Sequence, residues 1–159
     1  MKKRQKHSIR LIGRREYVDF PLLGITKTEA KIDTGAFSSA IHCENIEVQH
    51  ENGAQVLMFT LPEEFYAGNK TITHRFTEFK QKKIKNSFGE AEDRYVIRTK
   101  IHIGHKTIWA DFSLSDRKSM RYPILIGRKA IKGKFIIDVK QVHLNGLKLS
   151  VYLNQLSNT

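Results

Sequence analysis

The sequence is poor in the residues that build covalent cross-links, rigid turns and membrane spans. Its 159 residues include one cysteine (Cys43), three prolines and one tryptophan. A single cysteine excludes an internal disulfide framework and is typical of a reducing compartment. The longest apolar runs, such as 124–126, are too short to cross a bilayer, and residues 1–13 lack a signal-peptide core. We therefore expect a cytoplasmic protein with no membrane partner.

Acidic residues are also scarce. There are 28 Lys and Arg against 16 Asp and Glu, which gives a formal net charge of +12. Such a charge favours an acidic partner, such as nucleic acid, an anionic membrane or an acidic polypeptide. The alternative is that it serves solubility, together with a basic N-terminal tail.

The chain has no internal repeat and no linker that would divide it. Its length fits one domain, and the 40% content of hydrophobic residues supports a folded core. We expect residues 1–10 to form a basic tail and residues 11–159 to form a single domain.

The dominant pattern is alternation of apolar and polar residues, which is typical of β-strands. It predicts one long hairpin over residues 95–114 with a turn at Gly104-His105. Asn52-Gly53 and Asn145-Gly146 predict two further hairpins, because a two-residue turn needs positive φ at both positions. The second would join 135–144 to a strand at 147–151. The alternation continues to Leu153, so the tail 147–153 could form a dimer sheet or complete the barrel. The segment 128–132 is the best helix candidate, so we expect a mostly β fold, a small closed barrel with one short helix.

The sharpest local motif is Asp33-Thr34-Gly35 within Ala30–Ala36. An apolar strand leads into the aspartate, Gly35 allows close backbone approach, and the Thr34 hydroxyl can hold the loop by a local hydrogen bond. An ordinary β-turn between two strands is the alternative for this segment alone.

A second motif follows 94 positions later, where the apolar strand Tyr122–Ile126 runs into Gly127-Arg128 and a short helical segment. The two motifs, in this order, resemble those of the retropepsins, the dimeric aspartic proteases of retroviral type. More closely, the chain resembles a bacterial family commonly labelled ATP-dependent zinc proteases and now regarded as retropepsin-like. The resemblance covers about Ile12 to Val139. It includes 12–14, 30–40, 86–89, 92–94, 115–117 and 125–128.

This resemblance implies a retropepsin-like barrel, with a flap or insertion region at about 44–93, and an aspartic peptidase. Because the chain has one Asp-Thr-Gly, it also implies a homodimer in which Asp33 of each subunit forms the catalytic dyad. Asp33, Thr34 and Gly35 make up the catalytic loop, and the resemblance implies that Thr34 grips the same loop of the second subunit. Gly127 and Arg128 form the structural motif. In retroviral enzymes an acid after the Ala pairs with this Arg. Here Phe37 follows Ala36, so we expect Arg128 either to have another partner or to bind substrate.

The sequence contains no motif that supports the zinc or ATP dependence named in the family label. A phosphate loop needs four residues between its glycines, and Gly127–Gly133 has five. The pairs His102/His105 and His42/Cys43 are not zinc sets, and neighbours in a strand point to opposite faces. Cys43 is expected to be a small buried hydrophobe. We expect no metal and no cofactor.

Basic residues lie near the motifs. Ala36, Arg94, Arg117 and Arg128 are candidate substrate contacts, and lysines 80, 82, 83 and 85 fall in the expected flap region. They favour an acidic substrate channel, because guanidinium groups pair with carboxylates. A solvated surface is the alternative.

The sequence thus predicts an aspartic endopeptidase for acidic polypeptides. The family often accompanies ATP-grasp ligases that add glutamate, so the resemblance implies glutamate-rich substrates. Two other functions stay open. One is a catalytically silent module that binds an acidic partner or nucleic acid, although we do not expect nucleic acid. The other is a regulatory partner of an ATP-grasp ligase.

Overall fold

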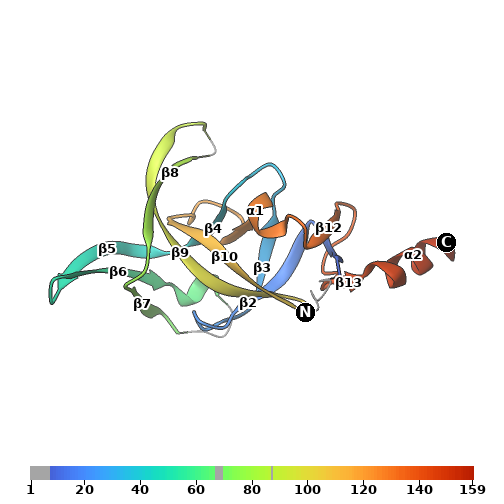
Figure 1. The fold of residues 1–159 in the computed structure, drawn as a ribbon, viewed down its shortest axis with the longest axis horizontal. Helices are drawn as coiled ribbons and strands as arrows, with labels where there is room; N and C mark the ends of the chain where they lie inside the picture. The colour runs from blue at the N-terminus through green and yellow to red at the C-terminus, as the bar shows by residue number, and fades with distance from the viewer. Residues whose placement is uncertain (1–7, 67–69, 87) are drawn as a thin grey trace, which may run out of the picture.

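The main body of the computed structural model, which describes residues 8–66, 70–86 and 88–159, is a closed β-barrel (Figure 1). Six strands follow one another in the order β10, β4, β11, β3, β2 and β9, and β9 closes the barrel by pairing with β10. The strands are β2 Arg15–Phe20, β3 Ile25–Ile32, β4 Ser39–His42, β9 Ala91–Ile103, β10 Lys106–Ser115 and β11 Ile124–Ile126. The predicted mostly β closed barrel is confirmed.

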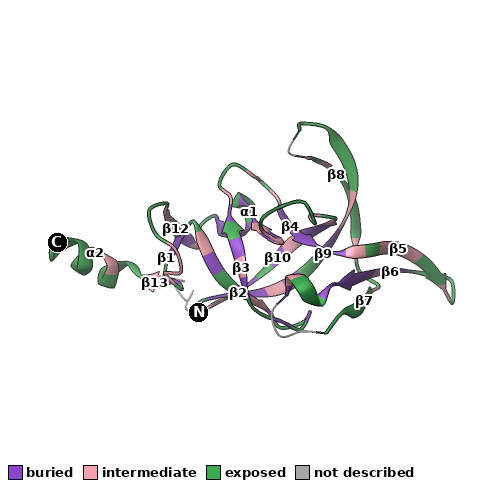
Figure 2. Ribbon diagram, turned by 180° about the vertical axis from the view of Figure 1, so that it is seen from behind, coloured by how far each residue is buried: buried purple, intermediate pink, exposed green. Residues whose placement is uncertain are grey.

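The long hairpin predicted around Gly104 is present as β9 and β10. Its strands are antiparallel, with Ile103 opposite Lys106 and Ile97 opposite Phe112. Apolar residues alternate into the barrel along both strands, and the ring of Phe112 meets Phe20 edge to face, with centroids 5.0 Å apart. Figure 2 shows the resulting pattern, with buried segments at the centre of the barrel and along β6, and exposed segments on β8 and α2. The alternation of apolar and polar residues along these two strands therefore indicated which of their side chains enter the core.

A second sheet branches from the barrel in the segment predicted as a flap or insertion. It contains β5 Glu44–Glu51, β6 Ala54–Leu61 and β7 Ile72–Phe76, and the 3₁₀ turn η1 Glu63–Phe65 follows β6. The Asn52-Gly53 turn joins β5 to β6 with φ of 49° and 79°, which confirms that hairpin. Strand β8, Lys80–Lys85, then pairs with the first half of β9 and leaves its other edge unpaired among the described residues.

The third sheet corrects the second predicted Asn-Gly hairpin. Asn145 and Gly146 do have positive φ, but the strands on either side do not pair with each other. Strand β1, Arg10–Gly13, lies between them. It pairs in parallel with β12, Phe135–Asp138, and antiparallel with β13, Leu147–Lys148. Asn145 and Gly146 thus have the predicted positive φ, but the predicted hairpin is wrong, because β1 from the other end of the chain lies between β12 and β13.

The helices agree with the sequence only in part. Helix α1, Arg128–Ile131, lies where the short helix was predicted. The strand predicted at 147–153 is wrong beyond Lys148, because Leu149–Ser157 forms helix α2, which projects away from the barrel (Figure 1). Leu147, Leu149, Val151 and Leu153 fit the alternation, whereas Leu149, Tyr152, Leu153 and Leu156 have helical spacing, so the pattern did not separate the two structures.

No helix in the described part of the chain has the length and apolar character needed to span a bilayer. Of the predicted basic tail, residues 1–7 lie outside the described residues, and Arg10 begins β1 rather than ending the tail.

Candidate active site

The Asp-Thr-Gly motif is the turn that leaves β3. Strands β3 and β11 are parallel neighbours with Ile32 opposite Ile126, so both motifs emerge from the same end of the barrel. The backbone N–H of Asp33 donates to the carbonyl of Ile126 over 2.9 Å. The N–H of Gly35 donates to Asp33 Oδ1 over 3.0 Å. These bonds fix the direction of a half-buried carboxylate at the mouth of the barrel.

Gly127 is fixed by close packing. Its N–H donates to the buried Ser39 Oγ over 3.0 Å. A Cβ on Gly127 would lie 2.4 Å from the carbonyl oxygen of Ser38, which is far inside van der Waals contact. The next two amides, of Arg128 and Lys129, donate to the carbonyls of Ala36 and Phe37 over 2.8 and 3.0 Å. The Gly-Arg motif thus fastens the segment that follows the candidate catalytic loop.

Arg128 finds a partner other than the missing acid. Its Nη1 donates to the carbonyl oxygen of Thr34 over 2.9 Å, and its guanidinium lies 6.0 Å from the centre of the Phe37 ring. A backbone carbonyl and an aromatic face replace the carboxylate. Arg128 therefore braces the Asp33 loop.

A groove of about 550 Å³ opens beside this loop, and we call it the Asp33 groove. Asp33, Gly35, Ala36, Arg94, Arg117 and Arg128 line it, so the fold brings these six predicted site residues together. Thr34 and Gly127 are not among the lining residues. Thr34 is exposed beside the groove and contributes its carbonyl to Arg128, whereas Gly127 is buried beneath the loop.

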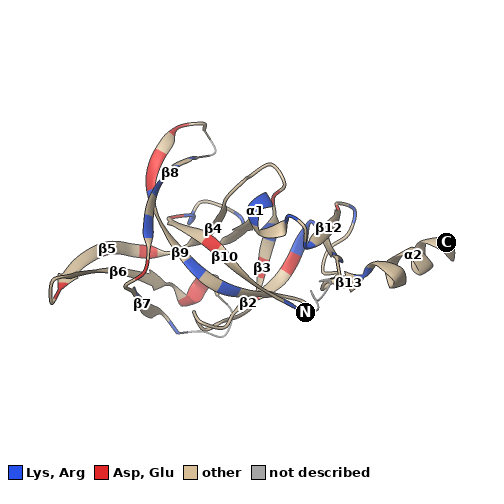
Figure 3. Ribbon diagram, viewed as in Figure 1, with Lys and Arg blue, Asp and Glu red and all other residues tan. Residues whose placement is uncertain are grey.

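The cations of the groove surround a single acid. Arg94, Arg117, Arg128, Lys83 and Lys85 line it, and Asp33 is the one carboxylate among the lining residues. Figure 3 shows basic residues along β9 and on α1, next to the site. Desolvation lowers the pKa of Arg117, and the nearby Arg94 adds to this effect, whereas the charge of Asp33 opposes it. The environment of Asp33 therefore favours an added anion.

Sequence reasoning missed the role of His42. Its side chain is fully buried, and its Nδ1 accepts the backbone N–H of Arg117 over 2.7 Å. The hydroxyl of Tyr66 donates to the carbonyl of His42. Burial lowers the pKa of His42, although Asp116 and Glu44 partly oppose this. His42 was considered only as half of a His-Cys pair, and nothing in its local sequence indicates that it would position Arg117.

Cys43 is buried, as expected, and burial raises the pKa of its thiol to about 12. Such a thiol is protonated at neutral pH and is a poor nucleophile. Among the described residues, no group of three or more His, Cys, Asp or Glu side chains is placed to hold a metal ion.

The sequence also missed the two serines that tie the strands under the site. Ser39 accepts the N–H of Gly127, and Ser113 Oγ donates to the Ser39 carbonyl over 3.2 Å. Both are buried. Their positions in apolar-polar alternation gave no sign of this, because the contact partners are 74 and 88 residues away.

Comparison with known families agrees with this geometry. The model of the RimB-like family, described as retropepsin-like aspartic endopeptidase RimB, matches residues 11–146. The chain belongs to the RimB-like family. The retropepsin-like part of the predicted resemblance is thereby confirmed, and the description of this family carries no zinc-protease label.

Relatives of this RimB-like chain carry a different name. A probable alpha-L-glutamate ligase of Desulfotalea psychrophila is 33% identical over 81% of the chain, and one of Shewanella pealeana is 32% identical over 92%. The matches cover 28% and 32% of those proteins, so the chain spans about a third of their length.

A solved structure has the same fold. It is a Legionella pneumophila protein of unknown function with 27% sequence identity and a TM-score of 0.69. The match covers 87% of this chain and 99% of that one.

Proposed function

We propose that this RimB-like chain is an aspartic endopeptidase that hydrolyses peptide bonds in acidic, glutamate-rich polypeptides. One observation carries the proposal: Asp33 is the single carboxylate lining a groove whose other charged residues are all cations. The family description supports hydrolysis. The cations, and the name of the relatives as probable glutamate ligases, support an acidic substrate.

Peptide hydrolysis by carboxylates needs two of them around one water. In aspartic proteases, two carboxyl groups about 3 Å apart share one proton, so that one acts as base and the other as acid. The base takes a proton from the water that attacks the carbonyl, and the acid protonates the carbonyl oxygen and then the leaving nitrogen. Since one chain supplies one such Asp, the second carboxylate of the proposed dyad is Asp33 of a second copy.

The backbone around Asp33 suits this task. The Gly35 amide donates to Oδ1, which orients the carboxylate and leaves Oδ2 for water or the partner carboxylate. Arg128 braces the loop from the groove side through the Thr34 carbonyl. Arg94 and Arg117 line the groove, where they are placed to bind carboxylates of the substrate. Arg94 also donates a hydrogen bond to Glu92.

The test is cleavage of a peptide that ends in several glutamates. Asp33→Asn is expected to abolish cleavage, whereas Asp93→Asn, an exposed acid outside the groove lining, is expected to retain it. Cleavage by Asp33→Asn at the wild-type rate would refute the proposal. Activity that survives EDTA would argue against a catalytic metal.

The shared dyad has its own test. Wild-type protein mixed with excess Asp33→Asn protein is expected to lose activity in proportion to the heterodimers formed, because each heterodimer has one intact carboxylate. Unchanged activity per wild-type chain, with subunit exchange verified by mass, would contradict a dyad made by two subunits.

The names of the relatives favour a second candidate, in which the domain regulates a glutamate ligase without hydrolysing peptides. In that case Asp33→Asn would leave function unchanged, and the purified chain would cleave nothing. Its measurable effect would be on the rate of a ligase added to the assay.

A further inference from the structure

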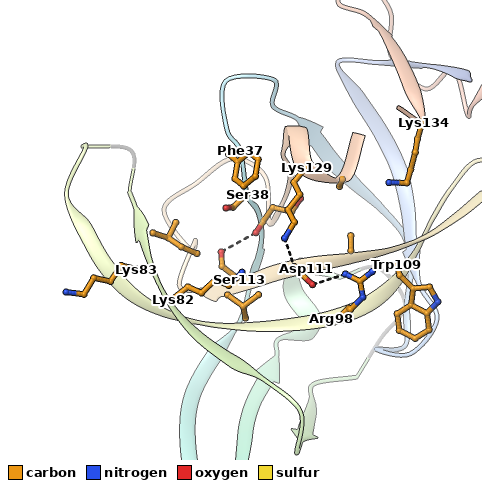
Figure 4. A pocket seen from close by; sticks show the side chains of 15 residues that line it. Phe37, Ser38, Lys82, Lys83, Arg98, Trp109, Asp111, Ser113, Lys129 and Lys134 are labelled. Atoms are coloured by element: carbon orange, nitrogen blue, oxygen red, sulfur yellow. Dashed lines mark hydrogen bonds and ion pairs between the residues drawn. The ribbon is translucent and has the colours of Figure 1, made fainter. Parts of the chain in front are cut away.

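A second cavity adjoins the Asp33 groove, and most of the charged residues that line it are basic. It has a volume of about 440 Å³ and lies between β8, β9, β10 and α1 (Figure 4). We call it the Trp109 pocket. It shares Phe37, Ser38, Lys83, Ile84 and Ser113 with the Asp33 groove, so the two are continuous.

Cations dominate the lining of the Trp109 pocket. Five basic residues face one acid there, and the five are Lys82, Lys83, Arg98, Lys129 and Lys134. The acid, Asp111, is already occupied. Arg98 and Lys129 hold its two carboxylate oxygens over 3.1 and 2.9 Å, and Figure 4 shows both side chains converging on it. Asp111 therefore anchors two of the cations and leaves a cationic surplus.

Three lysines of the lining are free to bind a ligand. Lys82, Lys83 and Lys134 have no side-chain hydrogen bond or ion pair within the part of the chain that the structure describes. Lys83 is shared with the Asp33 groove, whereas Lys82 and Lys134 line the Trp109 pocket alone. They come from β8 and from the loop after α1, on different sides of the pocket. Each ammonium can therefore form charge-assisted hydrogen bonds to a different carboxylate of one acidic ligand.

We propose that the Trp109 pocket is a second carboxylate-binding subsite, which holds acidic side chains of the same polypeptide several residues away from the bond cut at Asp33. The proposal rests on the proposed function for the choice of substrate, but not for the binding itself. An extended chain advances about 3.3 Å per residue, so a short acidic stretch reaches from one cavity into the next past Phe37. The subsite would select substrates with a run of acids over those with a single one.

The pocket fits a peptide better than a nucleic acid. A base would need the open face of an aromatic ring on which to stack. Trp109 has the ammonium of Lys100 placed over its ring, 5.4 Å from the centroid. Phe37, the other aromatic side chain of the lining, has the guanidinium of Arg128 6.0 Å from its ring centre. Both rings therefore already have a cation at one face, which disfavours a stacked base and leaves the lysine ammonium groups to bind carboxylates.

The protein contains its own probe for this pocket, because Trp109 is its single tryptophan and is half exposed there. Full-length Asp33→Asn protein would be titrated with an oligo-glutamate peptide long enough to span both cavities. We expect a saturable change in Trp109 fluorescence. A neutral Gly-Ser peptide of the same length is expected to produce none.

The variant that tests the subsite is Lys82→Gln with Lys134→Gln, and Lys140→Gln is the matched control on the exposed loop after β12. Charge-assisted hydrogen bonds contribute enough that we expect about a tenfold weaker binding of oligo-glutamate for the double variant. In the active protein the double variant should raise KM for long acidic substrates and leave kcat unchanged.

The outcomes separate the two proposals. Trp109 responses and the lysine effect without any cleavage by wild-type protein would overturn the peptidase and support the subsite. Cleavage with no Trp109 response and no lysine effect would overturn the subsite and leave the peptidase. A single-stranded RNA that displaces oligo-glutamate and binds more tightly would overturn the assignment to an acidic peptide.

Discussion

At the scale of single residues, the site depends on two side chains and on one glycine. Asp33 supplies the carboxylate, Arg128 braces its loop through a backbone carbonyl, and Gly127 permits the close approach of residues 37 and 38. The motif residues could be picked from the sequence because their types and order are characteristic. Their partners could not, since Thr34 O and Ser39 Oγ are chosen by the packing of strands far apart in the chain.

Gly127→Ala is expected to damage the site through this packing. A methyl group would have to displace the Ser38 carbonyl from 2.4 Å, so we expect a loss of stability of about 2–3 kcal/mol and loss of cleavage. Gly133→Ala is the control. It has φ of +74° but open space around it, and should cost about 1 kcal/mol. Equal unfolding midpoints for the two variants in urea would contradict the role given to Gly127.

His42 predicts a pH dependence of stability. Burial lowers its pKa in the folded protein, so below about 6.5 the unfolded chain binds a proton that the folded chain does not. Stability is then complete above that pH and falls as the solution is acidified. Asp116 and Glu44 beside the ring reduce the effect, and Lys118 and Arg117 increase it.

His42→Asn keeps an acceptor for the Arg117 amide and removes the titration. We expect its free energy of unfolding to fall less than that of the wild type between neutral pH and pH near 5. His74, whose pKa burial also lowers, accounts for part of the remaining slope. Parallel pH profiles for the two proteins would show that His42 does not contribute.

At the scale of elements, the parallel pair β3 and β11 decides where the site lies. Two strands that run in the same direction end at the same rim, which brings Asp33 and Gly127 together across 94 positions. The sequence showed both strands and both motifs, but not that the strands are neighbours. Helix α2 shows the opposite case. Strand β13 pairs with Arg10 and Leu11 at the beginning of β1, and beyond Lys148 no described strand remains to pair with.

Helix α2 should be dispensable for the barrel, because none of its residues is buried. A chain ending at Lys148 loses the hydrogen bond from Tyr152 to Asp138 and the contacts of α2 with β1 and β13, but no buried residue. We expect its unfolding midpoint to stay within a few degrees of the full chain, and its unfolding to remain cooperative. Thermal denaturation followed by Trp109 fluorescence measures this. A broad or strongly lowered transition would mean that α2 stabilises the body.

At the scale of the whole molecule, part of the net charge of +12 is concentrated around the two cavities. Arg94, Arg117 and Arg128 in the Asp33 groove and the lysines of the Trp109 pocket form one continuous cationic surface. A field of this kind attracts acidic chains and is screened by salt.

Salt should therefore weaken cleavage of acidic substrates selectively. We expect KM for a glutamate-tailed peptide to rise several-fold as sodium chloride is raised from low to well above physiological concentration, while kcat stays nearly constant. A neutral peptide cut by the same protein is the control and should change little. A KM for the acidic peptide that is independent of salt would count against the cationic surface as its binding site.

The sequence by itself determined the class of the fold and the identity of the two motifs. Alternation specifies which residues enter a barrel core, and Asp33-Thr34-Gly35 and Gly127-Arg128 are local in the chain. Only the tertiary structure decided that β1 separates the arms of the Asn145-Gly146 turn, that residues 149–157 are helical and that His42 positions Arg117. The reason is that neighbouring strands and buried hydrogen-bond partners are selected by the packing of the whole barrel, which no local pattern encodes.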